Sequence, residues 1–162
     1  MVPAHPIEFR VDDLSGDEVR ALVTAHVASM YDHSPPGSVH ALDVDALRGP
    51  GITFWSAWRG DDLVGCGALK RLDERRAEIK SMRVADGHVR QGIGRAILDH
   101  LLSEARKASF TSVWLETGTQ DAYLAAREMY EKAGFTYCPP FPPYVEDPSS
   151  TFMTRELTNP GL

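Results

Sequence analysis

The stretch Glu78-Ile-Lys-Ser-Met-Arg-Val84 is followed by Arg90-Gln-Gly-Ile-Gly-Arg95 and then by a long amphipathic segment. This order predicts a strand, a glycine turn and a helix. Gly92 and Gly94 lack a Cβ where the backbone turns sharply, so successive N–H groups can converge on an anion at the helix N-terminus. The lysine-containing phosphate loop is absent, and Ile97 replaces the third glycine of a dinucleotide fingerprint. We therefore expect a pyrophosphate that is not part of ATP or NAD.

Length and composition predict one domain over residues 1–162. The chain has 162 residues, of which 43% are hydrophobic and 25% charged, which suffices for one globular core but not for two. The 17 Lys and Arg against 23 Asp and Glu leave a formal charge of −6, which disfavours a nucleic-acid partner and favours a cationic one. Because the sequence has neither a long apolar run nor a basic segment before one, we expect a cytoplasmic protein without membrane contact.

The cysteines and histidines give no sign of a metal site. Cys66 and Cys138 lack the repeated spacing of a metal knuckle or a disulfide framework, so we expect ordinary thiols. The histidines include no His-x-x-x-His pair. The sequence therefore predicts no metal.

Hydrophobic periodicity predicts a mixed sheet flanked by helices. Strands are expected at 7–11, 52–58, 63–72, 77–84, 111–117, 135–138 and 151–157, and helices at 15–29, 94–108 and 121–133. Because residues 77–117 follow the order strand, helix, strand, they predict a parallel β-α-β crossover. The segments 31–40 and 139–148 contain prolines that favour loops. The expected fold class is α/β, in the α+β sense, with a mostly antiparallel sheet of about six to seven strands.

Two motifs resemble those of the GNAT N-acetyltransferase superfamily, whose members transfer an acyl group from acyl-coenzyme A to an amine. The turn Gly92-Ile-Gly94 and its flanks are similar to the family's pyrophosphate loop. The run Met129-Tyr-Glu-Lys-Ala-Gly-Phe135 resembles the family's Tyr-x-Lys-x-Gly-Phe signature. Two positions depart from the family pattern, because Val89 stands where Arg or Gln is usual and Tyr123 where Asn is common.

The resemblance implies that acetyl-CoA is the acyl donor. Its pyrophosphate would meet the glycine loop, and main-chain amides of residues 82–84 would run beside the rest of the carrier and stabilise charge on the carbonyl oxygen. The residues expected to contact acetyl-CoA are Met82, Arg83, Val84, Arg90, Gln91, Gly92, Ile93, Gly94, Arg95, Thr117, Tyr123 and Tyr130.

The reaction expected from the resemblance is direct attack of an amine on the thioester. An amine with a pKa of about 10.4 is mostly protonated at pH 7, so a base must accept its proton. Glu78 is similar to the glutamate that relatives use for this step, with Glu116 and then His33 or His40 as alternatives. The resemblance further implies that Tyr130 protonates the departing sulfur.

Strand geometry bears on the orientation of Glu78. Simple alternation along the strand places its side chain on the same face as Met82 and Val84, and a bulge would reverse that assignment.

The acceptor is expected to bind near the early loop and the proline-rich segment, which in this superfamily tend to form the substrate mouth. The residues predicted there are Tyr31, His33, His40, Glu116 and Tyr144. Their mixture of aromatic and titratable groups suits a small amine or an amino-acid derivative. We expect an N-acetyltransferase acting on a small molecule. The alternatives are acetylation of a protein lysine or N-terminus, or an acyl-CoA-binding module without catalysis; the resemblance also leaves a homodimer open.

Overall fold

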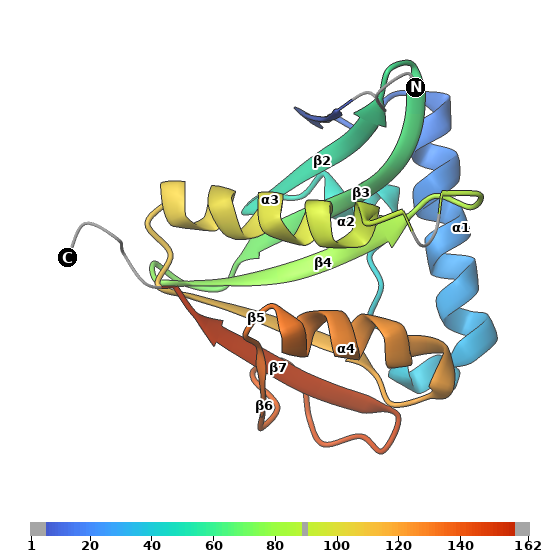
Figure 1. Ribbon diagram of the computed structural model, residues 1–162. Helices are drawn as coiled ribbons and strands as arrows, with labels where there is room; N and C mark the ends of the chain where they lie inside the picture. Colours follow the sequence, from blue (N-terminus) through green and yellow to red (C-terminus); the bar gives the residue numbers. More distant parts are fainter. Residues whose placement is uncertain (1–5, 89–90, 158–162) are drawn as a thin grey trace.

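The computed structural model describes residues 6–88 and 91–157 (Figure 1). Its strands are β1 (Ile7–Val11), β2 (Ile52–Arg59), β3 (Asp62–Arg71), β4 (Arg76–Val84), β5 (Ser112–Gly118), β6 (Thr136–Cys138) and β7 (Ser150–Glu156). They form one seven-stranded sheet in the order β1-β2-β3-β4-β5-β7-β6. Neighbouring strands are antiparallel except β4 and β5, which are parallel. The predicted fold class is thereby confirmed.

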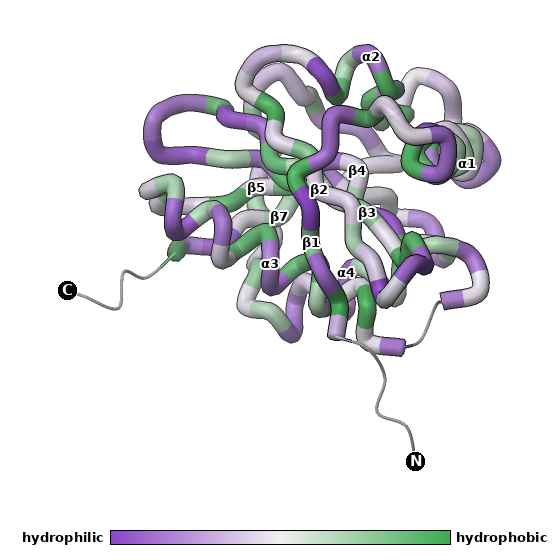
Figure 2. Tube along the Cα trace, turned by 90° about the horizontal axis from the view of Figure 1, so that it is seen from above, coloured by the Kyte–Doolittle hydropathy of each residue, from purple (hydrophilic) through white to green (hydrophobic). Residues whose placement is uncertain are grey.

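Helices cover both faces of this sheet. They are α1 (Asp17–His33), α2 (Val44–Leu47), α3 (Ile93–Lys107) and α4 (Leu124–Lys132), and two 3-10 turns, η1 (Pro36–Ser38) and η2 (Asp121–Tyr123), accompany them. In Figure 2, α1 and α2 lie on one side of the strands, and α3 and α4 on the other. The helix α3 connects the parallel strands β4 and β5, as the sequence predicts.

Each helical layer buries its own apolar cluster. The cluster beneath α3 and α4 includes Ile97, Leu98, Leu101, Leu102, Ala105 and Ala133. The cluster beneath α1 and α2 consists of Leu14, Val19, Leu22, Val23, Leu47, Phe54, Cys66 and Ala68. Gly67 on β3 lets α3 approach closely, because a Cβ there would lie 3.0 Å from the side chains of Ile97 and Leu101. The helices are therefore fixed against the sheet by packing at helical spacing.

The helix α1 is longer than the sequence predicts. Its expected end was near residue 29, but the helix continues to His33 and ends at Ser34. The chain offers no helix breaker before Pro35, so local preference alone sets no earlier end. Tyr31 and His33 therefore lie in the last turn of a helix, and their predicted place in a loop is wrong.

The strands β4 and β5 pair over a short distance only. Their parallel register joins Arg76 to Ser112, Ala77 to Val113 and Glu78 to Trp114. Beyond Glu78 and Trp114 the two strands continue without pairing to each other. The sheet therefore opens between the second halves of β4 and β5.

A bulge in β4 reorients the side chains beside this opening. The register between β3 and β4 shifts between Cys66 and Ala68, and Ser81 adopts the left-handed region at φ 54°. As a result Met82 and Val84 pack against the cluster beneath α3. The expectation from simple alternation, which placed Glu78 on their face, is wrong, because the bulge inserts one extra residue between them.

The glycine turn starts α3. Gly92 is the N-cap of α3 with φ +78°, and no side chain caps the helix there. An L-residue adopts this left-handed conformation only at a cost, so Gly92 is required for the direction of the turn. The main-chain N–H groups of the first helical turn have no partner within the helix.

Replacing Gly92 with alanine should lower the free energy of unfolding by about 1–2 kcal/mol, because a Cβ disfavours the left-handed region. Denaturant unfolding without added ligand measures this effect. Gly16→Ala is the matched control, because Gly16 is the N-cap of α1 with φ −80° and open space around its Cα. Both variants lose a preferred N-cap residue, so an equal loss of stability in the two would contradict the assigned role of Gly92.

Candidate active site

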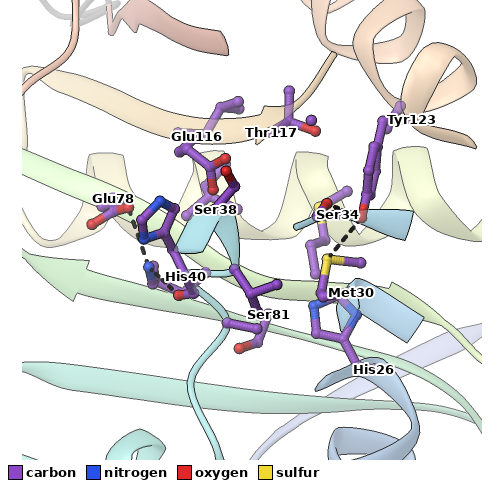
Figure 3. A pocket seen from close by; sticks show the side chains of 18 of the residues that line it. His26, Met30, Ser34, Ser38, His40, Glu78, Ser81, Glu116, Thr117 and Tyr123 are labelled. Carbon is purple, nitrogen blue, oxygen red and sulfur yellow. Dashed lines mark hydrogen bonds and ion pairs between the residues drawn. The ribbon is translucent and has the colours of Figure 1, made fainter. Parts of the chain in front are cut away.

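The candidate active site is a pocket at the opening between β4 and β5. Figure 3 shows Glu78, His40 and Glu116 toward one end, and His26, Met30 and Tyr123 toward the other. The predicted site residues that line it are His40, Glu78, Met82, Glu116, Thr117, Tyr123 and Tyr130. We call the part with Glu78, Glu116, His40 and Lys80 the acidic end, and the part with His26, Met30, Ser34, Ser81 and Tyr123 the bulge end.

At the acidic end, Glu78 is held by two partners. Its side chain is 2% exposed, and its Oε2 accepts a hydrogen bond of 2.5 Å from the Tyr144 hydroxyl. The Lys80 Nζ lies 3.5 Å from the same oxygen. Lys80 also donates to the Tyr144 hydroxyl at 2.7 Å and to the main-chain oxygen of His40 at 3.1 Å. Burial, with the neighbouring Glu78 charge, raises the pKa of Tyr144, so this tyrosine stays a neutral donor.

Glu116 on β5 is the second carboxylate of the acidic end. Among the described residues, it forms no ion pair with Lys, Arg or His, in contrast to Glu78. Burial raises its pKa above the usual value for a glutamate. A carboxylate with a raised pKa is a stronger base, so its environment suits proton transfer near neutral pH.

Tyr130 lies on α4 beside Glu116. Its side chain is 7% exposed, and its ring lies 5.7 Å from that of Phe135 between centroids. Burial, together with the smaller effect of the Glu116 charge, raises the pKa of Tyr130 to about 12. The tyrosine is therefore protonated at neutral pH and close enough to Glu116 to feel its charge.

Tyr123 connects η2 to α1 at the bulge end. Its hydroxyl lies 3.1 Å from the Ser34 Oγ and 3.4 Å from the Met30 Sδ. Gly118 makes room for its ring, because a Cβ at that position would overlap the ring. Arg127 fixes the same segment by donating to the Gly118 main-chain oxygen at 2.7 Å.

The glycine loop offers backbone donors with open space before them. A Cβ at Gly92 would meet no atom within 4 Å. The Gln91 Oε1 accepts a 3.0 Å hydrogen bond from Arg59, and the Arg95 Nε donates to Asp99 at 3.0 Å. These two side chains are therefore engaged with the protein, whereas the amides of Ile93, Gly94 and Arg95 at the start of α3 have no partner within the helix. Arg90, also predicted here, lies outside the described residues.

The residues predicted to bind the acceptor are only partly brought together. His40 lines the pocket, and its ring contacts that of Tyr144 edge to face at 5.0 Å. His33 does not line the pocket, and its ring lies edge to face with that of Tyr123 at 6.3 Å between centroids. Tyr31 is 55% exposed and does not line the pocket, because the longer α1 turns it toward solvent. Tyr144 does not line the pocket. It contacts two residues that do, Glu78 and Lys80.

The lining residues that were not predicted to belong to the site include His26, Lys80 and Ser81. His26 follows Leu22 and Val23 at helical spacing, so its position on the buried face of α1 was readable from the sequence. Burial, together with the smaller effect of the Arg83 charge, lowers the pKa of His26 to about 4. The orientations of Lys80 and Ser81 follow from the bulge, for which the sequence carries no local signal.

Comparison with known proteins identifies the class of this chain. A family model described as the Acetyltransferase (GNAT) family matches residues 19–135. An uncharacterised N-acetyltransferase of Bacillus subtilis is 51% identical over 93% of this chain and 100% of its own length. Another from Escherichia coli is 46% identical over 92% of this chain and 94% of its own. A Bacillus subtilis acetyltransferase solved in complex with CoA shares the fold, with a TM-score of 0.72 and 17% identity over 94% of this chain and 100% of that one.

The chain belongs to the GNAT acetyltransferase family. It is an enzyme of the N-acetyltransferase type, as the sequence motifs predict, with acyl-CoA as the supported donor and an amine as the acceptor. In the part of the chain that the structure describes, no helix is long and apolar enough to span a membrane. The same residues contain no cluster of three or more His, Cys, Asp or Glu that could hold a metal ion.

The buried neutral His26 predicts acid sensitivity. Since its folded-state pKa of about 4 lies below the ordinary 6.5, the unfolded chain binds the extra proton first, and stability falls as pH drops from 6.5 toward 4. This contribution reaches about 3 kcal/mol near pH 4. His26→Gln should lose correspondingly less stability than the wild type between pH 7 and pH 4.5 in denaturant unfolding. Identical losses in the two proteins would show that His26 is not the group that titrates.

Proposed function

We propose that this enzyme transfers an acetyl group from acetyl-CoA to the amine of a small molecule, directly and in a ternary complex. The observation that carries the proposal is the pocket between β4 and β5, which places two carboxylates and Tyr130 at one opening in the sheet. The start of α3, with its free amides, lies at the end of β4 that borders this opening. Donor and acceptor can therefore meet between the two helical layers.

For the donor, the proposed contacts are mainly with the backbone. The amides at the start of α3 hold the pyrophosphate, and the main chain of residues 82–84, which no longer pairs with β5, runs beside the rest of the carrier. Thr117 and Tyr123 border the same opening from the opposite side. An amide of residues 82–84 stabilises the negative charge that develops on the carbonyl oxygen.

For the base, the contacts favour Glu116 over Glu78. Glu78 already forms an ion pair with Lys80 and accepts a short hydrogen bond from Tyr144, so its carboxylate is engaged with the protein. Among the described residues Glu116 forms no ion pair, and burial raises its pKa despite the opposing charges of His40 and Lys80. Glu116 therefore accepts the proton of the attacking amine. Glu78 has a structural role, because it holds Lys80 and Tyr144 in place at the acidic end.

For the acid, Tyr130 donates its hydroxyl proton to the departing sulfur. Its pKa of about 12 lies above the value of about 8.5 typical of a thiol, so the transfer is uphill and assists departure without being indispensable. The neighbouring Glu116, once protonated by the amine, no longer disfavours the negative charge left on Tyr130. In this proposal Glu116 first accepts the proton of the amine, and the neighbouring Tyr130 then donates a proton to the sulfur.

The acceptor is a small molecule in this proposal, because loops close the acidic end. Lys80 ties the loop of His40 and the segment of Tyr144 to β4 through the contacts described above, which leaves a pocket in place of an open groove. Release of thiol from acetyl-CoA, measured across a panel of free amines and of peptides, tests this point. Turnover of peptides alone would indicate a protein acetyltransferase. Binding of CoA by calorimetry without turnover of any acceptor would indicate a binding module. A single domain, a cytoplasmic location and a homodimer stay predictions.

Glu116→Gln should lower kcat at pH 7 by about a hundredfold or more, since a general base typically contributes that much. The deficit should shrink toward pH 10, where the free amine is deprotonated without help. Glu78→Gln is the matched control and should lower kcat by less than about tenfold, because its amide oxygen can still accept from Tyr144. A larger loss in Glu78→Gln, rescued by high pH, would transfer the role of base to Glu78.

Tyr130→Phe should lower kcat by about a hundredfold with little change in CoA affinity, because the ring still packs and only the proton donor is lost. Steady-state kinetics and calorimetric titration with CoA measure the two effects separately. Tyr137→Phe, on an exposed tyrosine of β6, is the control for loss of a hydroxyl. An unchanged kcat in Tyr130→Phe would remove Tyr130 from the mechanism.

A further inference from the structure

The bulge end of the pocket contains buried polar atoms that lack partners. Among the described residues, the His26 Nδ1, the Ser81 Oγ and the Arg83 Nε are buried without a hydrogen bond. His26 and Ser81 both line the pocket. Leaving such groups unpaired is unfavourable, most of all for a charged guanidinium. A ligand that accepts hydrogen bonds here would remove the penalty for all three.

Arg83 lies next to the other two residues. Burial lowers the pKa of His26 and the Arg83 charge also lowers it, so the guanidinium lies within electrostatic reach of the imidazole. Burial also raises the pKa of Cys66 to about 12, and the Arg83 charge opposes this rise. The Cys66 Sγ in turn donates to the main-chain oxygen of Ser81 at 3.2 Å. Arg83, His26 and Ser81 therefore lie in one region of the molecule, around the bulge of β4.

The positive charge at this point is incompletely neutralised. The Nη2 of Arg83 lies 3.5 Å from Asp86, whose side chain is 91% exposed, and such pairs contribute little. The side chain of Arg83 is itself only 18% exposed. By contrast, Lys80 already donates to His40 and Tyr144 and pairs with Glu78. Arg83 does not itself line the pocket, but it is a largely buried cation next to the lining residue Met82, and its Nε has no hydrogen-bond partner among the described residues.

Backbone strain also marks the bulge. Ser81 has φ 54°, which a non-glycine residue adopts at a cost and which is found preferentially at functional sites. The bulge directs Met82 and Val84 to the cluster beneath α3, whereas the side chain of Arg83 lies toward α1. One segment of β4 can therefore offer its main chain to the acyl donor and the Arg83 side chain to the acceptor.

We propose that the bulge end is a subsite for a carboxylate carried by the acceptor. Arg83 supplies the charge, and the Ser81 hydroxyl and the neutral His26 imidazole supply further hydrogen bonds. The amine of the same molecule points to Glu116. The substrate class is then amines that carry a carboxylate, such as amino acids. This inference rests on the proposed function, since it assigns a second contact to the same acceptor.

Matched pairs of acceptors test the subsite. Glycine, β-alanine, γ-aminobutyrate and L-lysine are each compared with their carboxamide, which keeps the amine and removes the negative charge. The wild type should favour at least one acid over its amide by about tenfold to a hundredfold in kcat/KM, as expected for a charge-assisted contact. Equal kcat/KM within every pair, or preference for the amides, would overturn the proposal.

Variants locate the contact. Arg83→Gln should remove the preference by lowering kcat/KM for the acid much more than for the amide, and Arg83→Lys should retain part of it. Arg10→Gln, which alters an exposed arginine on β1, should leave both substrates unaffected. If thermal unfolding shows that Arg83→Gln does not fold, Ser81→Ala must show a loss selective for the acid. A loss shared equally by acid and amide would contradict the subsite.

Binding separates failure of this inference from failure of the proposed function. If no amine is acetylated, the proposed function fails, but the N-acetyl derivatives of the same acids and amides can be titrated into the CoA-saturated protein by calorimetry. Binding of the N-acetyl acids that depends on Arg83 would still support the carboxylate subsite. Binding of neither set would overturn it. Turnover of amines without any preference for acids would overturn the subsite alone.

Discussion

The early end of pairing between β4 and β5 is the constraint on which the site depends. Parallel strands that stayed paired would present a continuous surface, with no route between the helical layers. Because pairing stops after Glu78 and Trp114, main-chain groups of both strands are left without sheet partners. Such groups are stable only where solvent or a ligand satisfies them. The opening is therefore both a gap in the hydrogen-bond pattern and the place where polar ligands bind most favourably.

The bulge at Ser81 then decides which side chains face which layer. One extra residue moves Met82 and Val84 to the cluster beneath α3 and leaves Glu78 with Lys80 on the opposite face. The buried thiol of Cys66 donates to the Ser81 oxygen and so supports a backbone conformation that is unfavourable by itself. Packing beneath α3 and the chemistry of the pocket are in this way fixed by the same few residues of β4.

The two carboxylates of the pocket differ because of their neighbours. Glu78 is tied to Lys80 and Tyr144, and through them to two loops, so removing its charge would disturb the wall of the pocket. Glu116 forms no ion pair with the other residues that the structure describes, and it lies within electrostatic reach of Tyr130. A paired carboxylate stabilises structure, whereas an unpaired, partly desolvated one is suited to proton transfer. Residue type alone does not distinguish the two, since both are strand glutamates.

The sequence by itself determined the order of the elements, the glycine turn at Gly92 and the place of Tyr130, because each depends on local periodicity or on a short motif. It did not determine the length of α1, which moved Tyr31 away from the pocket, or the contact of Tyr144 with Glu78. Only the tertiary structure decided these features and the bulge. A register shift and a hydrogen bond between residues far apart in the chain depend on the packing of several elements at once, and no single stretch of sequence encodes that packing.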